Sequence, residues 1–252
     1  MGTLYLVRHG QASFGAEDYD NLSDLGVKQS VRLGEYWRGK GLKFDAVLIG
    51  TLKRHAQTYA GICDGICDGM GDGMGERTGA NARPNTQALQ WPGLNEYDSH
   101  AVISAVHPAP LQKPDTPELY RHHFRLLRDG LTQWMNGVVS PKGMPTYPEF
   151  LKGITNALDH VRGLQHEAKG DSHGDKHGVS GNVLIVSSGG PIATAVGHVL
   201  GTAPETTIEL NLRIRNSSVT EFAFNPKRHM LVTYNTLPHL DSPEHADWVT
   251  YA

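Results

Sequence analysis

Three short apolar runs, each followed by a helical pattern, constrain the fold of this 252-residue chain more than any other feature. The first run covers residues 3–8, the second 44–50, and the third begins the segment 182–201. Apolar residues recur at helical spacing after each of them, over 23–39, over 52–62 and in the second half of 182–201. Alternating strands and helices predict a mostly parallel central sheet covered by helices on both faces, a three-layer α/β/α sandwich.

The rest of the chain predicts fewer regular elements. Two helices are expected near 116–138 and 147–168, and 213–235 alternates like two antiparallel strands around an Asn-Pro turn. Residues 61–79 repeat GICD and are rich in glycine, which indicates a flexible insertion near 61–80. We expect one domain over 1–252, in which helices and loops near 97–150 cover the substrate.

Composition excludes several classes of protein. The net charge is −3 with the 14 histidines counted as neutral, which argues against a nucleic-acid binder. No apolar run is long enough to span a membrane, and the first residues lead straight into a strand with no signal peptide. Cys63 and Cys67 lack the second pair that a zinc site needs, so a reducing compartment, the cytoplasm, is expected.

The polar residues that follow the three apolar runs form a candidate anion site. Arg8-His9-Gly10 ends the first run, Arg54 follows the second, and Ser187-Ser188-Gly189-Gly190 follows the third. If these strands are neighbours, their carboxyl ends meet in one crevice. Two guanidinium groups and a helix N-terminus can then hold a phosphoryl group, and an imidazole beside them can attack phosphorus.

These residues lie in segments that resemble the histidine phosphatase superfamily, also called the phosphoglycerate mutase-like family. LYLVRHGQ resembles its RHG signature, and TLKRHAQTYA is similar to its SPLxRAxQTA segment. Four further segments are similar to other family segments: NLSDLGVKQS, LNEY, LIVSSGGPIATAVGHVLG and NSSVTEFAF. The matches follow the family's order across nearly the whole chain, and they imply the phosphoglycerate mutase-like fold.

The resemblance implies a role for each matching residue. His9 would be the nucleophile that becomes a phosphohistidine, and Glu96 would protonate the leaving alcohol. Arg8 and Arg54 would hold the phosphoryl oxygens, helped by Ser188 and the backbone N–H of Gly189. The activity implied is a phosphatase that hydrolyses phosphate monoesters without a cofactor or metal, acting on a phosphorylated small molecule or a phosphoprotein. The physiological substrate and the oligomeric state stay open.

Three positions depart from the family pattern. Ser188 stands where the family has a second histidine, Gly50 where it has serine, and Phe14-Gly15 where many members have Trp-Asn. A serine hydroxyl can donate a hydrogen bond but brings no positive charge, and losing one donor to transferred charge typically costs about 3–4 kcal/mol of barrier. On this reasoning Ser188→His should raise activity.

Alternatives stay open at several of these residues. His9 could be an ordinary strand-end histidine, Arg54 a surface arginine and Glu96 a solvated carboxylate. Ser188 could simply permit a tight turn, and we expect His55 to face away from the site. Two other functions remain, a phosphoglycerate mutase-type transfer and a phosphate-binding regulatory module with weak or no catalysis.

Overall fold

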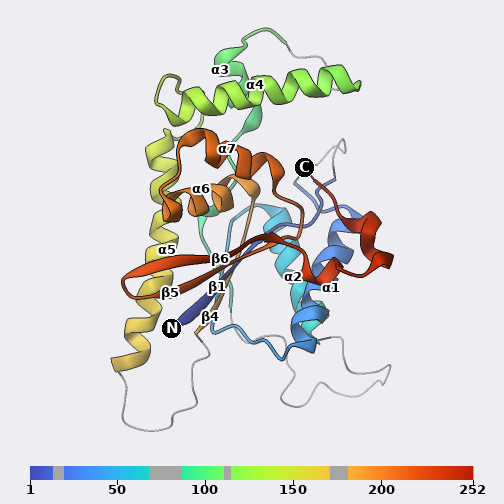
Figure 1. The fold of residues 1–252 in the computed structure, drawn as a ribbon, viewed down its shortest axis with the longest axis vertical. Coiled ribbons are helices and arrows are strands. Elements are labelled where there is room, and N and C mark those ends of the chain that lie inside the picture. The colour runs from blue at the N-terminus through green and yellow to red at the C-terminus, as the bar shows by residue number, and fades with distance from the viewer. Residues whose placement is uncertain (14–19, 68–86, 111–114, 171–180, 252) are drawn as a thin grey trace.

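The computed structural model describes residues 1–13, 20–67, 87–110, 115–170 and 181–251, and has one six-stranded sheet at its centre (Figure 1). Its strands are β1 (Gly2–Arg8), β2 (Ala46–Ile49), β3 (Leu89–Gln90), β4 (Asn182–Ser187), β5 (Val219–Asn225) and β6 (Arg228–Thr236). Their order is β3-β2-β4-β1-β5-β6. The first four of these are parallel, and β5 and β6 complete the sheet in antiparallel pairing.

Helices cover both faces of this sheet (Figure 1). The α-helices are α1 (Asp24–Gly39), α2 (Lys53–Cys67), α3 (Ser99–Val106), α4 (Pro117–Met135), α5 (Tyr147–Gly170), α6 (Gly189–Leu200) and α7 (Pro204–Arg213). Three 3₁₀ turns complete the described elements: η1 (Pro92–Leu94), η2 (Pro238–Leu240) and η3 (Pro243–Trp248). Helices α1 and α2 pack on one face, α5 and α6 on the other, and α3 and α4 extend beyond α7 at one end.

Alternation along the central strands divides the core into two clusters. Leu4 and Leu6 of β1 join the cluster with α5 and α6, whereas Val7 joins the cluster with α1 and α2. In β4, Ile185 and Val186 also point to opposite faces, and both side chains are fully buried. Successive side chains of a strand point to opposite faces, so a strand covered on both sides must be apolar throughout. This explains the continuous apolar runs in the sequence.

The predicted three-layer α/β fold is confirmed. The strands expected at 3–8, 44–50 and the start of 182–201 are β1, β2 and β4, and the antiparallel pair expected over 213–235 is β5 with β6. Ser23 caps the start of α1, since its side chain accepts a hydrogen bond from the backbone N–H of Gly26.

Three expectations about secondary structure were wrong. Helix α2 continues to Cys67, so residues 61–67 belong to a helix and not to the glycine-rich insertion; residues 68–80 of that insertion lie outside the described part of the chain. Helices α3 and α7 were missed. Gly61 and Gly65 fit in α2 because it packs closely on α1: a Cβ on Gly65 would lie 2.0 Å from the carbonyl oxygen of Val31.

Across the described ranges, no helix is both long enough and apolar enough to cross a membrane.

Candidate active site

The sheet brings the ends of β1, β2 and β4 together at one edge. Strand β4 lies between β1 and β2, and Arg8 pairs with Ser187 at the last position of the β1–β4 register. The backbone N–H of His9 donates to the carbonyl oxygen of Ser187 at 2.9 Å, and that of Gly50 donates to Val186 at 3.1 Å. The segments that follow β1, β2 and β4 therefore start from one edge of the sheet.

Arg8, His9, Arg54 and Glu96 line one cavity of about 440 Å³, which we call the main cavity. Arg8 and His9 stand at the end of β1, Arg54 stands at the start of α2, and Glu96 follows η1. The remaining lining residues come from the segment after Glu96 and from α3, α4 and α7: Tyr97, Asp98, Ser99, His100, Tyr120, His123, Phe124, Leu127, Asn211 and Leu212. Four of the residues singled out in the sequence thus share one space.

His9 lines the main cavity, and 4% of its surface is exposed. Its Nδ1 atom lies 2.7 Å from the carbonyl oxygen of Gly10. Burial lowers the pKa of His9 well below 6.5, and the nearby charges of Arg8 and Arg54 lower it further. The imidazole is therefore neutral near pH 7, with its lone pair on Nε2, which is the form a nucleophile needs.

Gly10 allows the chain to turn sharply after His9. A Cβ at Gly10 would lie 2.3 Å from the carbonyl oxygen of Gly26, and a Cβ at Gly26 would lie 2.1 Å from that of Gln11. The N–H of Gly10 donates to Thr58 Oγ1 at 3.1 Å, and the N–H of Gln11 donates to Gln29 Oε1 at 2.8 Å. Helices α1 and α2 therefore fix the backbone on which His9 is mounted.

Both arginines are buried and held by oxygen acceptors. Arg8 Nη1 donates to the carbonyl oxygen of Ile214 at 2.6 Å, and Arg54 Nη1 donates to Asp20 Oδ1 at 2.8 Å. Asp20 lies at the edge of the site, with 29% of its side chain exposed. Two guanidinium groups fixed in this way present positive charge to an anion in the main cavity, with little rotamer entropy left to lose on binding.

Glu96 lies against the start of α6. The N–H of Gly190 donates to both of its carboxylate oxygens, at 3.2 and 3.1 Å. Burial raises the pKa of Glu96, and it outweighs the lowering by the Gly190 hydrogen bond and by Arg8 and Arg54. A hydrogen bond of 2.6 Å from Ser187 Oγ to the carbonyl oxygen of Leu94 fastens the Glu96 segment to β4. Glu96 is thus a fixed carboxyl group that holds its proton to higher pH than usual.

Ser188 and His55 form a buried pair beside His9. Neither side chain is exposed at all, and His55 Nε2 lies 2.7 Å from Ser188 Oγ. The ring centroids of His55 and His9 are 5.9 Å apart. The expectation that His55 faces away from the site was wrong. A signal was available: His55, Thr58, Ile62 and Gly65 recur at helical spacing and form the buried face of α2.

The other predicted residues have simpler positions. Gly189 begins α6 next to Arg8: a Cβ on it would lie 3.7 Å from Arg8 Nε. Gln11, the residue after Gly10, stabilises the local turn, since Ser23 Oγ donates to Gln11 Oε1 at 2.8 Å. Phe14 and Gly15 lie outside the described residues. Among the residues that the structure describes, no cluster of histidine, cysteine, aspartate and glutamate has the arrangement of a metal site.

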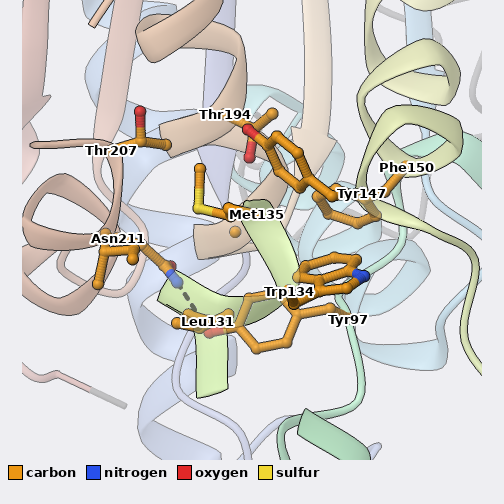
Figure 2. Close-up of a pocket in the computed structure, with 11 residues that line it drawn as sticks. Tyr97, Leu131, Trp134, Met135, Tyr147, Phe150, Thr194, Thr207 and Asn211 are labelled. Atoms are coloured by element: carbon orange, nitrogen blue, oxygen red, sulfur yellow. Dashed lines mark hydrogen bonds between the residues drawn. The ribbon is translucent and has the colours of Figure 1, made fainter. Parts of the chain in front are cut away.

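Tyr97 lines the main cavity and is held by contacts with α4 and α7. Its hydroxyl accepts a hydrogen bond of 2.8 Å from Asn211 Nδ2, and its ring packs 5.9 Å from that of Trp134 (Figure 2). Phe150 and Tyr147 complete an aromatic cluster around Trp134. Because this cluster joins the segment after Glu96 to α4, α5 and α7, it places the α3–α4 region over the main cavity.

Comparison with known proteins finds a family match over the first part of the chain. Residues 4–68 match the family model described as histidine phosphatase superfamily (branch 1). Among curated protein sequences there is no match.

Solved structures with the same fold cover nearly the whole chain. The alpha-ribazole phosphatase from Shigella flexneri has 16% identity and a TM-score of 0.58, with 93% of this chain and 96% of that chain covered. A mycobacterial glucosyl-3-phosphoglycerate phosphatase has 18% identity and a TM-score of 0.57, with 94% and 99% covered. A phosphoserine phosphatase mutant from Entamoeba histolytica has 16% identity and a TM-score of 0.51, with 95% and 100% covered.

The α/β fold brings a strand-end histidine, two arginines and a glutamate to the wall of one cavity. Residues 4–68 thus match the histidine phosphatase superfamily model, and the chain as a whole shares the fold of these solved structures.

Proposed function

We propose that this protein is a phosphatase that hydrolyses phosphate monoesters through a phosphohistidine on His9. The observation that carries the proposal is that Arg8, His9, Arg54 and Glu96 line one cavity although they come from distant parts of the sequence. The three phosphatases of the same fold support it, since each is named for hydrolysis of a phosphate ester.

The first chemical step transfers the phosphoryl group to the protein. Arg8 and Arg54 bind the non-bridging oxygens and neutralise their charge. The lone pair on Nε2 of His9 attacks phosphorus, and the bond between phosphorus and the ester oxygen breaks. Glu96 gives its proton to that oxygen, so that an alcohol leaves in place of a poor alkoxide leaving group.

The second step releases phosphate. Glu96, now a carboxylate, takes a proton from a water molecule as the water oxygen attacks phosphorus. The phosphorus–nitrogen bond breaks, and the electron pair returns to Nε2 of His9. This step regenerates neutral His9 and protonated Glu96. Since the arginines supply the positive charge, the proposed reaction needs no metal or cofactor.

The walls of the main cavity suggest which esters fit. Its aromatic and aliphatic surface comes from Tyr120, Phe124, Leu127 and Leu212. Among the described lining residues, the arginine and lysine side chains are those of Arg8 and Arg54. A substrate with a second strong anion finds no further cation there within the described part of the chain. We therefore infer a phosphate ester whose alcohol portion is apolar or aromatic, either a small molecule or a side chain of a phosphoprotein. Tyr120, Phe124 and Leu127 lie within the region 97–150, which was expected from the sequence to cover the substrate.

A mutase would have to hold a phosphorylated sugar acid while the phosphoryl group returns to it. The carboxylate of such a substrate needs a positively charged partner, so the same walls favour hydrolysis over isomerisation. A binding module without catalysis would need no proton donor at the leaving group, whereas Glu96 is held beside the cavity with a raised pKa. A cytoplasmic location is part of the proposal, since a chain of this size with only two cysteines is typical of a reducing compartment.

The decisive experiment measures phosphate release from a panel of phosphate esters, with His9→Ala as the control. The panel includes phenyl phosphate, phosphoserine, a phosphotyrosine peptide and 3-phosphoglycerate. We expect release by the wild type, none above background by His9→Ala, and an acid-labile phosphoryl label that only the wild type carries. Equal activity of the two proteins, or binding of phosphate without turnover, would overturn the proposal.

A further inference from the structure

The imidazole of His55 occupies the place between the ends of β2 and β4. Its Nε2 atom is 2.7 Å from Ser188 Oγ, at the start of α6, and its ring centroid is 5.9 Å from that of His9. The imidazole therefore contacts the serine that stands where the family pattern has its second histidine. It comes from α2, on the other side of the site.

Gly50 leaves the space that this imidazole fills. A Cβ on Gly50 would lie 2.1 Å from His55 Nδ1 and 2.6 Å from Cε1, so any larger residue would displace the ring. Gly50 and Ser188 are two of the departures noted in the sequence, and both contact His55. The three residues are therefore one structural unit, in which each small residue makes room for the same ring.

The ring is neutral in the structure. Burial lowers the pKa of His55 to about 3. The positive charge of Arg54 lowers it further, whereas the backbone of Gly50 acts to raise it. Although the Gly50 backbone is near, Nδ1 makes no well-aligned hydrogen bond to any described residue. The bond to Ser188 is thus the principal polar contact of a fully buried side chain, so it fixes both the ring and the hydroxyl.

We propose that His55 is the second imidazole of this active site, supplied from α2, and that it is a positioning residue for phosphoryl transfer through Ser188 and the ring of His9. The inference rests on the proposed phosphatase function. As a neutral group, His55 leaves the charge of the phosphoryl group to Arg8 and Arg54. It holds the start of α6, where Gly190 binds Glu96, and limits the orientations open to His9.

This arrangement reverses the expectation for Ser188→His. With His55 Nε2 already 2.7 Å from Ser188 Oγ, a second imidazole on residue 188 has no room. Ser188→His alone should therefore lower activity. The same change should be tolerated once the first ring is removed, in the double variant H55A/S188H, because the imidazole then enters the same space from α6.

The experiment compares kcat and KM for phenyl phosphate in five variants: H55A, S188A, H55A/S188A, S188H and H55A/S188H. We expect H55A and S188A each to lower kcat by roughly 10- to 100-fold with KM nearly unchanged, the size seen for groups that orient a reacting residue. The double alanine variant should be no worse than the poorer single one, because the two residues act as a unit. H55A/S188H should recover about 10-fold over H55A.

A matched control separates positioning from simple loss of packing. His229→Ala removes another buried histidine, on β6, which stacks on Phe224 and does not line the main cavity. It should lower thermal stability and leave kcat unchanged. Tungstate binding, measured by calorimetry, gives a readout independent of turnover. It should be weaker in H55A and partly restored in H55A/S188H.

The outcomes distinguish this inference from the proposed function. If His9→Ala is inactive but folded H55A keeps kcat within about twofold and binds tungstate like the wild type, the role of His55 is refuted and the phosphatase stands. If S188H is more active than the wild type, the role is likewise refuted. If wild type and His9→Ala are equally active, the phosphatase proposal fails, whereas the tungstate series still decides whether His55 shapes the anion site.

Discussion

The Nδ1 atom of His9 lies 2.7 Å from the backbone carbonyl oxygen of Gly10, the next residue in the chain. A carbonyl can only accept, so Nδ1 carries the proton and Nε2 keeps its lone pair. Gly10 is itself fixed, because its N–H donates to Thr58 Oγ1 and its Cα lies against the backbone of Gly26. The tautomer needed for attack on phosphorus is thus set by how β1, α1 and α2 pack together.

His9 should therefore stay neutral in acid. Its pKa lies well below 6.5 because of burial and the two arginines, so the ring should show no protonation between pH 7 and pH 6. Nitrogen chemical shifts from ¹⁵N-labelled histidine measure this directly, and the urea-unfolded protein, whose histidines titrate near 6.5, is the reference. Protonation of the His9 ring near pH 6.5 in the folded protein would contradict the geometry.

Glu96→Gln should separate substrates by the quality of their leaving group. Glutamine keeps the size of the side chain but cannot give a proton. We expect kcat for an alkyl phosphate to fall by about 10²- to 10⁴-fold. The loss should be much smaller for p-nitrophenyl phosphate, whose phenolate leaves without a proton.

The pH dependence of the same variant has a definite sign. Because the pKa of Glu96 is raised, the wild type should lose its rate with alkyl esters as pH rises through that value, and Glu96→Gln should not. Asp98→Asn is the matched control. Asp98 also lines the main cavity, but its side chain caps α3, so this change should cost only a few-fold. Equal losses on both kinds of ester would refute the acid role.

The close approach between the residues after His9 and helix α1 predicts a large effect of one methyl group. In Gly26→Ala the Cβ would lie 2.1 Å from the carbonyl oxygen of Gln11, so the loop that carries His9 must move. We expect a loss of about 1–3 kcal/mol in the free energy of unfolding, together with lower activity. Urea unfolding and phosphate release measure both.

Gly39→Ala is the control in the same helix, since a Cβ at Gly39 meets no atom within 4 Å. It should be neutral or stabilise the protein by up to about 1 kcal/mol, because alanine is the better helix former. Equal effects of the two substitutions would mean that Gly26 is not the contact that fixes the loop.

The fold could be predicted because its signals are local. Continuous apolar runs with helical patterns after them identify β1, β2 and β4, since each strand is buried on both faces and each helix has one apolar stripe. Helix α7 was not predicted because its ten residues include two adjacent threonines and few apolar positions. Helix α3 was not predicted because it is short and is followed by a segment with several prolines.

The site could be predicted only in part, for a geometric reason. Arg8 and His9 stand at the end of β1, and Arg54 stands at the start of α2 soon after β2, so strand order brings them to the same edge of the sheet. The direction of the His55 side chain depends on how α2 is rotated about its own axis relative to β4. The packing of α2 against α1 determines this rotation. The remaining walls of the main cavity come from α3, α4 and α7, and no pattern in the sequence specifies how those helices approach the cavity.

Two buried histidines should make the protein sensitive to acid. Burial lowers the pKa of His55 and of His239 to about 3, from 6.5 in the unfolded chain. Between those values the unfolded state binds more protons, so the free energy of unfolding falls as pH falls, by about 1.4 kcal/mol per pH unit and group. Urea unfolding at pH 7, 6 and 5 measures the slope.

His239→Gln isolates one of these contributions. His239 Nε2 lies 3.0 Å from Ser217 Oγ, a bond that a glutamine amide can replace without titrating. The variant should lose less stability than the wild type between pH 7 and pH 5, by about 2 kcal/mol. An identical slope in both proteins would show that the imidazole of His239 is accessible to protons in the folded state.

Phe124 should decide how well the protein binds the alcohol portion of its substrate. It lines the main cavity from α4 and packs 5.1 Å from Tyr120, so an aromatic or apolar ester group would contact its ring. Phe124→Ala should raise KM for phenyl phosphate by roughly 10-fold, the value of one apolar contact of about 1–2 kcal/mol, with kcat nearly unchanged. KM for phosphoserine should barely change, because its small polar side chain does not reach this wall. The control is Arg125→Ala, because Arg125 is an exposed neighbour of Phe124 on the same helix and does not line the main cavity.

The contradicting outcome is equally clear. If Phe124→Ala impaired both esters equally, or improved the aromatic one, α4 would not be the surface that selects the substrate.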